Sequence, residues 1–120
     1  MTKKILIVDD KKNIVALIKR ILERKNFKVI TASNGKEALE KVYDKAPDLM
    51  ILAEMDGCRV CKEIRQDPLY RRLPIIMLNG KATTSTHIKA LNLGADVFMS
   101  KPFRRRELVV RIKSLLRNEY

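Results

Sequence analysis

The sequence predicts an α/β fold in which a parallel five-stranded sheet is covered by helices on both faces. Two observations support this prediction. Five short runs are almost continuous in Val, Ile, Leu and Met, as expected of strands that are buried on both faces. Helical patterns separate these runs, and the connections between them are short. The predicted strands are Ile5–Val8, Lys28–Ala32, Leu49–Leu52, Pro74–Leu78 and Asp96–Met99.

Each predicted helix has a local signal. Residues 12–25 place apolar side chains at the i, i+3, i+4, i+7 spacing of an amphipathic helix. Asn34 followed by Glu37 is a typical helix start. A weaker pattern begins near Ser85 or Thr86. The five predicted helices cover residues 12–25, Asn34 to near Pro47, Gly57–Gln66, Ser85 or Thr86 to Gly94, and Arg104 almost to Tyr120.

Right-handed crossovers between parallel strands leave few topologies for this alternation. We expect a flavodoxin-like (βα)5 three-layer sandwich with strand order 2-1-3-4-5, formed by residues 1–120 as a single domain. In that order the connections from the first and third strands run to opposite sides of the sheet. Ligands normally bind at this topological switch point. The residues that leave these two strands are Asp9, Asp10 and Ala53.

Composition restricts the classes of function. No apolar run approaches the length of a membrane-spanning helix, and the N-terminus does not resemble a signal peptide, so we expect a cytoplasmic protein without membrane contact. The formal net charge is +12. This charge favours anionic partners, but a solvated basic surface without a specific partner explains it equally well. Both interpretations stay open.

Seven short pieces of the chain occur in a fixed order that is typical of one family. They are Ile5–Asp10, Asn34–Leu39, Pro47–Leu49, Met55–Gly57, Pro74–Leu78, Gly94–Asp96 and Lys101–Phe103. In this order and spacing they resemble the receiver domain of bacterial response regulators, the phosphorelay proteins of two-component systems. The resemblance covers nearly the whole chain.

The resemblance implies phosphoryl transfer from a histidine kinase to an aspartate at the end of the third strand. In that family two acids after the first strand help to bind Mg²⁺, and a lysine after the fifth strand contacts the phosphoryl group. Asp9 and Asp10 match the acids, and Lys101 matches the lysine. Phe98 matches an aromatic residue that changes position on activation.

Two departures from the family pattern predict that the phosphorylation pocket is vestigial. Ala53 stands at the acceptor position, or the acceptor has been deleted, and a methyl group cannot accept a phosphoryl group. Asn79 replaces the usual hydroxyl residue after the fourth strand. We therefore expect a degenerate pseudo-receiver that is not an enzyme and has no catalytic residue. Any metal site would use Asp9 and Asp10, and Mg²⁺ binding is expected to be weak or absent.

The segment between the third strand and the third helix is also shorter than in the family. We expect the shortened turn to displace that helix or to remove its first turn. Glu54 and Asp56 lie in this segment. An alternative hypothesis is that one of these carboxylates replaces the missing acceptor and that the chain is still a phosphorelay receiver. The expected partner is a signalling protein, such as a histidine kinase or an output domain.

The first and last helices are rich in cations and are predicted to cover the same face of the sheet. The candidate basic surface comprises Lys19, Arg20, Arg24, Arg104, Arg105, Arg106 and Arg111. It is either a solvated surface or a binding surface for nucleic acid or an acidic protein. The chain has three Tyr, three Phe and no Trp, so side chains that stack on bases are scarce.

Cys58 and Cys61 form a C-x-x-C pattern at the start of the third helix. This pattern is compatible with a thiol redox pair, but a packing role is the favoured interpretation because free Cys commonly behaves as a small buried apolar residue.

Overall fold

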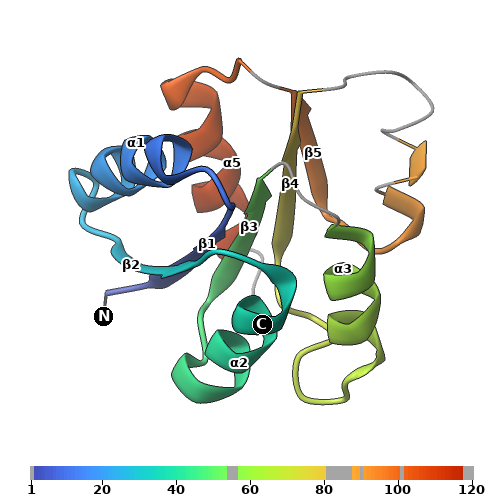
Figure 1. The fold of residues 1–120 in the computed structure, drawn as a ribbon. Helices are drawn as coiled ribbons and strands as arrows, with labels where there is room; N and C mark the ends of the chain where they lie inside the picture. Colours follow the sequence, from blue (N-terminus) through green and yellow to red (C-terminus); the bar gives the residue numbers. More distant parts are fainter. Residues whose placement is uncertain (1, 54–56, 81–87, 90, 101, 118–120) are drawn as a thin grey trace.

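The computed structural model describes residues 2–53, 57–80, 88–89, 91–100 and 102–117. Five parallel strands form one sheet in the order β2-β1-β3-β4-β5 (Figure 1). The predicted strand order is therefore confirmed. The strands are β1 (Lys4–Val8), β2 (Lys28–Ala32), β3 (Leu49–Ala53), β4 (Ile75–Asn79) and β5 (Val97–Ser100).

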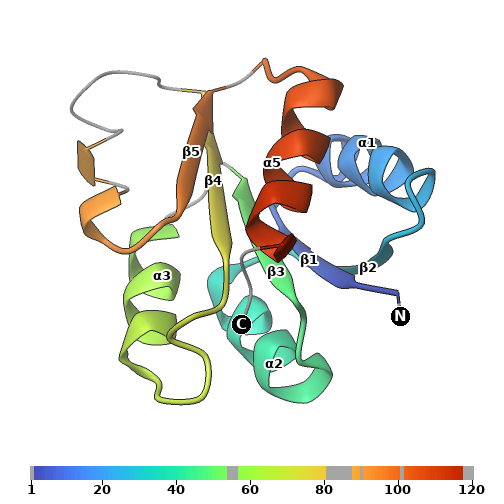
Figure 2. The same cartoon turned by 180° about the vertical axis from the view of Figure 1, so that it is seen from behind.

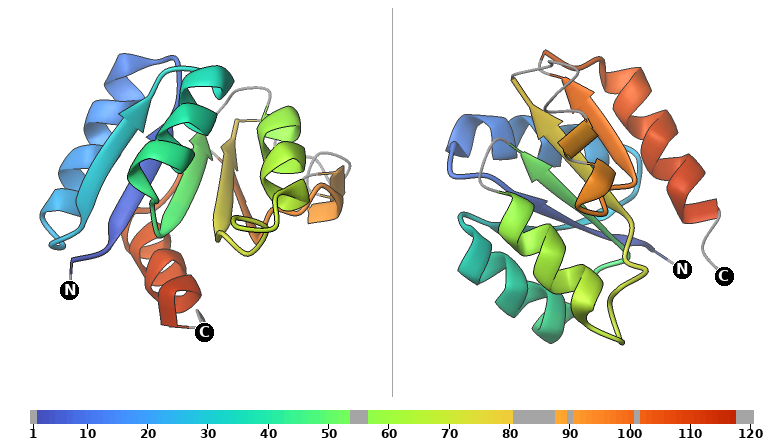
Figure 3. Two further views of the ribbon diagram at one scale, coloured as in Figure 1. Left: turned by 90° about the horizontal axis from the view of Figure 1, so that it is seen from below. Right: turned by 90° about the vertical axis from the view of Figure 1, so that its right-hand side faces the viewer.

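Helices cover both faces of this sheet. One face carries α1 (Lys12–Glu23) and α5 (Arg105–Arg117), and the other carries α2 (Gly35–Lys45) and α3 (Gly57–Gln66). Figures 2 and 3 show these two helical layers and the sheet between them. Residues 88–89 and 91–92 are helical, as expected of the fourth helix, whose expected start at Ser85 or Thr86 lies outside the described residues.

The core has two halves because successive strand residues point to opposite faces of the sheet. Ile5 and Ile7 of β1 pack with side chains from α1 and α5, whereas Leu6 and Val8 pack with side chains from α2 and α3. All five residues of β3 are buried. The central strand therefore has no side chain in solvent, which agrees with its apolar sequence.

The start of α2 has the predicted cap. The Asn34 side chain accepts a hydrogen bond from the backbone N–H of Glu37 at 2.8 Å. The Ser33 hydroxyl donates to the Glu37 carboxylate at 3.0 Å. The first bond satisfies one of the initial backbone N–H groups, which have no partner within the helix, and the second holds the Glu37 side chain next to the cap.

Four large apolar residues in the helical segments are exposed to solvent, namely Leu17, Tyr43, Ile88 and Leu91. Helical periodicity identifies an apolar face, but it does not show whether a neighbouring element covers the whole of that face. Tyr43 packs its ring edge-on against Tyr70 with centroids 5.3 Å apart, and its hydroxyl donates to Asp67 at 2.9 Å. These contacts at the surface join α2 to the segment after α3.

Candidate functional site

The candidate site lies at the carboxyl edge of the sheet, where β1 and β3 end side by side. The strand register pairs Val8 with Leu52, so the next residues, Asp9 and Ala53, lie at the same level. Asp9 is only 2% exposed, and Ala53 is fully buried. The two residues occupy the topological switch point, which is where ligands bind in open α/β sheets.

The backbone around Asp9 holds its carboxylate at this edge. The Asp9 N–H donates to the carbonyl of Ala32 at 3.1 Å, which extends the pairing of β1 with β2. One oxygen of its carboxylate accepts a hydrogen bond from the N–H of Lys11 at 3.1 Å. Asp10, in contrast, is exposed to solvent. The two predicted acids therefore have different surroundings, although they are adjacent in sequence.

Of the other predicted site residues, Asn79 lies at this end of the sheet, whereas Phe98 lies two residues before the end of β5. Asn79 is the last residue of β4 and is half-buried. Phe98 is half-buried in β5 and packs against the half of the core under α2 and α3. Glu54, Asp56 and Lys101 lie outside the described residues.

The described residues do not fit a magnesium site. Mg²⁺ requires nearly octahedral oxygen coordination and is usually held by carboxylates together with substrate phosphate. Within the described ranges, no group of three or more acidic, His or Cys side chains is placed to hold a metal ion. The end of β3 contributes the methyl group of Ala53 to this edge, and a methyl group cannot bind a metal ion.

The predicted basic surface is partly assembled. Arg20 and Arg24 of α1 and Arg105 and Arg106 of α5 line one groove between these two helices. Lys19 lines an adjoining hollow on α1. Arg104 and Arg111 are exposed but do not line the groove. The structure adds Lys25 and Lys113 to the groove, together with an apolar floor that sequence reasoning did not identify.

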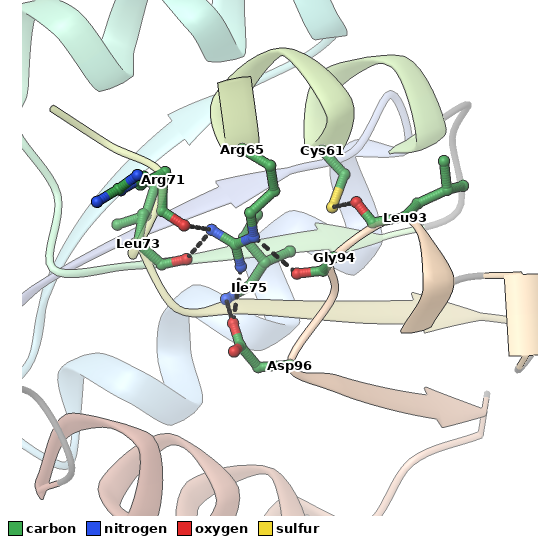
Figure 4. Close-up of polar contacts among 8 residues, drawn as sticks. All are labelled: Cys61, Arg65, Arg71, Leu73, Ile75, Leu93, Gly94 and Asp96. Carbon is green, nitrogen blue, oxygen red and sulfur yellow. Dashed lines mark hydrogen bonds and ion pairs between the residues drawn. The ribbon is translucent and has the colours of Figure 1, made fainter. Parts of the chain in front are cut away.

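Sequence reasoning also missed a polar cluster around Arg65, which is drawn in Figure 4. The Arg65 guanidinium donates to the Asp96 carboxylate at 2.9 Å and to the Gly94 carbonyl at 2.8 Å. It also donates to the carbonyls of Arg71 and Leu73 at 2.9 and 2.7 Å. This one side chain thus connects α3 to the segment before β4 and to the segment before β5.

The neighbouring residues leave little space around Arg65. Gly94 has a φ of +104°, and a Cβ atom added to it would lie 2.7 Å from the Arg65 side chain. Cys61, one turn earlier on α3, is fully buried, and its thiol donates to the carbonyl of Leu93 at 3.2 Å. Its burial supports the packing interpretation of this cysteine. The side chain of Cys58 lies outside the described residues.

The fold and the site define a class of signalling module. The chain belongs to the response regulator receiver domain family, which matches residues 5–113. Receiver domains act in two-component signalling, where they bind Mg²⁺ at the phosphorylation site and interact with histidine kinases and output domains.

Particular relatives agree with this assignment. The chain is 46% identical over 121 residues to the alkaline phosphatase synthesis transcriptional regulatory protein PhoP of Bacillus subtilis, covering 98% of this chain and 50% of that protein. The chain therefore spans about half the length of this curated relative.

Solved structures show the same fold. A candidate response regulator from Chloroflexus aurantiacus is 34% identical with a TM-score of 0.93, and the match covers 98% of this chain and 100% of that one. The chemotaxis response regulator CheY4 of Vibrio cholerae is 27% identical with a TM-score of 0.88 over 96% of this chain and 99% of that one. The predicted flavodoxin-like α/β fold is confirmed.

Of the helices that the structure describes, none has the length and apolar character needed to cross a bilayer.

Proposed function

We propose that this chain is a degenerate receiver domain that acts in two-component signalling through protein–protein contacts, without phosphorylation of an aspartate. The observation that supports the proposal is the end of β3. Ala53 is fully buried there, at the level of Asp9, and its methyl group has no lone pair with which to attack a phosphoryl donor. The partner is a signalling protein, either a histidine kinase or an output domain.

The loss of one carboxylate affects more than the acceptor. Phosphoryl transfer depends on positioning and on the neutralisation of negative charge by metal and cations. In the proposed pocket, Asp9 and Asp10 remain as acids and Lys101 remains as the cation, while Asn79 supplies an amide in place of a hydroxyl. These residues are proposed to be a vestige of the family's site, and Phe98 a vestige of its switch residue.

Phosphorylation is tested by intact-mass measurement after incubation with acetyl phosphate and Mg²⁺. We expect the mass to remain that of the unmodified chain, while a receiver with an aspartate at the end of its third strand, treated in parallel, gains a phosphoryl group. The variants Glu54→Gln and Asp56→Asn are the matched controls. A single adduct on the wild-type chain that is lost in one of these variants would contradict the proposal and identify the substitute acceptor.

Metal binding is tested separately, by following backbone amide NMR signals of residues 9–11 during titration with Mg²⁺. We expect no saturation in the millimolar range, because the described donors do not complete an oxygen shell. Ala53→Asp is the informative variant, since it adds the missing carboxylate and should strengthen the response, with circular dichroism as the check on folding. Saturation of the wild-type chain at low millimolar Mg²⁺ would show that the pocket still binds the ion.

A further inference from the structure

A groove of about 620 Å³ runs between α1 and α5 on one face of the molecule. Both helices lie side by side on the same face of the sheet (Figure 2). Of the predicted pocket residues that the structure describes, Asp9, Asp10, Ala53 and Asn79, none lines the groove. Its lining residues are Leu17, Arg20, Ile21, Arg24, Lys25, Arg105, Arg106, Val109, Val110 and Lys113.

The groove carries charge of one sign only. Among the described residues that line it, six are Lys or Arg and none is acidic. Within the described part of the chain, the side chains of these six residues form no hydrogen bond and no ion pair. The ion pairs that are present, such as Arg65–Asp96 and Arg59–Glu63, lie on other elements. Glu23 lines the adjoining hollow beside Arg20 and Arg24, but it is one acid against the six cations of the groove. An excess of clustered cations produces a positive potential that attracts and orients an anionic partner.

Apolar side chains form the floor between these cations. Leu17 is 42% exposed and Val110 is 53% exposed, while Ile21 and Val109 are buried beside them. A second hollow shares Lys25, Val110 and Lys113 with the groove and extends it along α5 towards Leu116. The surface therefore combines an exposed apolar strip with a cationic rim, which is a common arrangement in protein interfaces.

We propose that the α1–α5 groove docks an acidic amphipathic helix of a protein partner. Its carboxylates would pair with the rim arginines, which suit carboxylates because a guanidinium donates two parallel hydrogen bonds. Its apolar side chains would cover Leu17 and Val110, as in other complexes in which a helix lies in a groove. This inference rests on the proposed function, since it names the chemistry of the partner for a domain that signals by contact.

The composition of the groove favours a protein over nucleic acid. None of the described residues that line the groove is aromatic, and Phe27, which lines the hollow that extends it, is half-buried, so side chains on which bases could stack are scarce. A phosphate backbone would use the cations but would leave the apolar floor without a partner. An acidic amphipathic helix uses both features of the surface.

The test measures fluorescence anisotropy with three probes of equal negative charge. The first is a Glu-rich helical peptide with Leu at positions i, i+3, i+4 and i+7, the second has Ser in place of each Leu, and the third is a single-stranded oligonucleotide. We expect the Leu peptide to bind at least about tenfold more tightly than either of the others at near-physiological salt. Equal binding of all three would overturn the proposal in favour of a general polyanion surface, and no binding of the Leu peptide would also overturn it.

Variants locate the binding. We expect the pair Arg20→Glu and Arg106→Glu to weaken Leu-peptide binding at least about tenfold, since each variant places a like charge opposite the peptide carboxylates. The matched control is the pair Lys36→Glu and Lys62→Glu, which makes the same charge change on exposed positions of α2 and α3 across the sheet. Val110→Ser removes apolar surface without changing charge. It should weaken the binding of the Leu peptide and leave the binding of the other two probes unchanged.

If the groove variants and the control pair lost the same amount of affinity for the Leu peptide, net charge rather than the groove would govern binding. The mass measurement stays independent of these outcomes. A phosphoryl adduct would overturn the proposed function and leave the peptide measurements unchanged, whereas failed peptide binding without an adduct would overturn only the docking inference.

Discussion

At the residue scale, the Arg65 side chain connects α3 to the segments that precede β4 and β5. Its side chain is 20% exposed, and its guanidinium donates to three backbone carbonyls and one carboxylate. The same Asp96 oxygen accepts the backbone N–H of Ile75 at 2.8 Å. Hydrogen bonds that involve a charged group contribute more to stability than neutral ones, and these carbonyls would lose their donor if Arg65 were removed.

Replacing this side chain by an apolar one of similar length tests its role. We expect Arg65→Met to lower the free energy of unfolding by roughly 2–4 kcal/mol, because the partly buried carbonyls of Leu73 and Gly94 lose this charged donor and the Asp96 carboxylate keeps only the N–H of Ile75. Asp96→Asn should have a smaller effect, since the three bonds to carbonyls remain. Urea denaturation measures both changes.

The control is Arg59→Met on the same helix. The Arg59 side chain is 85% exposed and forms only an i,i+4 ion pair with Glu63, so we expect a change within about 0.5 kcal/mol. If Arg65→Met destabilised the protein no more than Arg59→Met, the cluster would contribute little to the stability of the fold.

The residues that sequence reasoning found and those that it missed differ in a physical respect. Asp9, Ala53 and Asn79 directly follow or end apolar strands, so their place at one edge of a parallel sheet follows from the strand pattern. The partners of Arg65 are backbone carbonyls from two distant segments. No spacing of residue types reveals such acceptors before the chain is folded.

At the element scale, periodicity located every strand and the four helices whose bounds are described, with shifts of one or two residues at some ends. The predicted first helix ended at Lys25, whereas α1 ends at Glu23. Asn26 has a φ of +68°, and the N–H of Phe27 returns to the carbonyl of Leu22. Asn adopts this left-handed conformation more readily than most residues, so Asn26 was the signal for the helix end.

Burial within the helices was harder to predict than their existence. Leu17 falls on the apolar face of α1 by spacing, but it lines the groove between α1 and α5 and is exposed to solvent there. The separation of two helices depends on the side chains that pack between them, and the sequence of one helix does not contain that information. The groove and its apolar floor therefore emerged only from the folded chain.

At the scale of the whole molecule, the net charge of +12 acts on stability as well as on recognition. Like charges repel in the compact state, and the repulsion is greatest where cations are clustered. Arg105 and Arg106 stand in the first turn of α5, where the helix dipole also disfavours positive charge. The groove is thus a place where binding and folding stability place opposite demands on the same side chains.

This opposition predicts how salt and neutral substitutions change stability. We expect the unfolding midpoint to rise when salt is added, because counterions screen the repulsion between exposed cations. The pair Arg105→Gln and Arg106→Gln should raise the free energy of unfolding by about 0.5–1 kcal/mol at low salt, and the gain should shrink at high salt. The control pair, Lys36→Gln and Lys62→Gln, removes the same charge from exposed positions on the other face. Its free energy of unfolding should rise by less.

Urea denaturation at low and high NaCl measures these differences, and binding of the Leu peptide is measured on the same samples. If the groove serves docking, the protein with Arg105→Gln and Arg106→Gln should bind the Leu peptide more weakly and have a more stable fold. This is expected where residues needed for binding lower the stability of the fold. If this pair were less stable than the wild-type chain at low salt, these arginines would be stabilising the fold, and their clustering would need no binding partner to explain it.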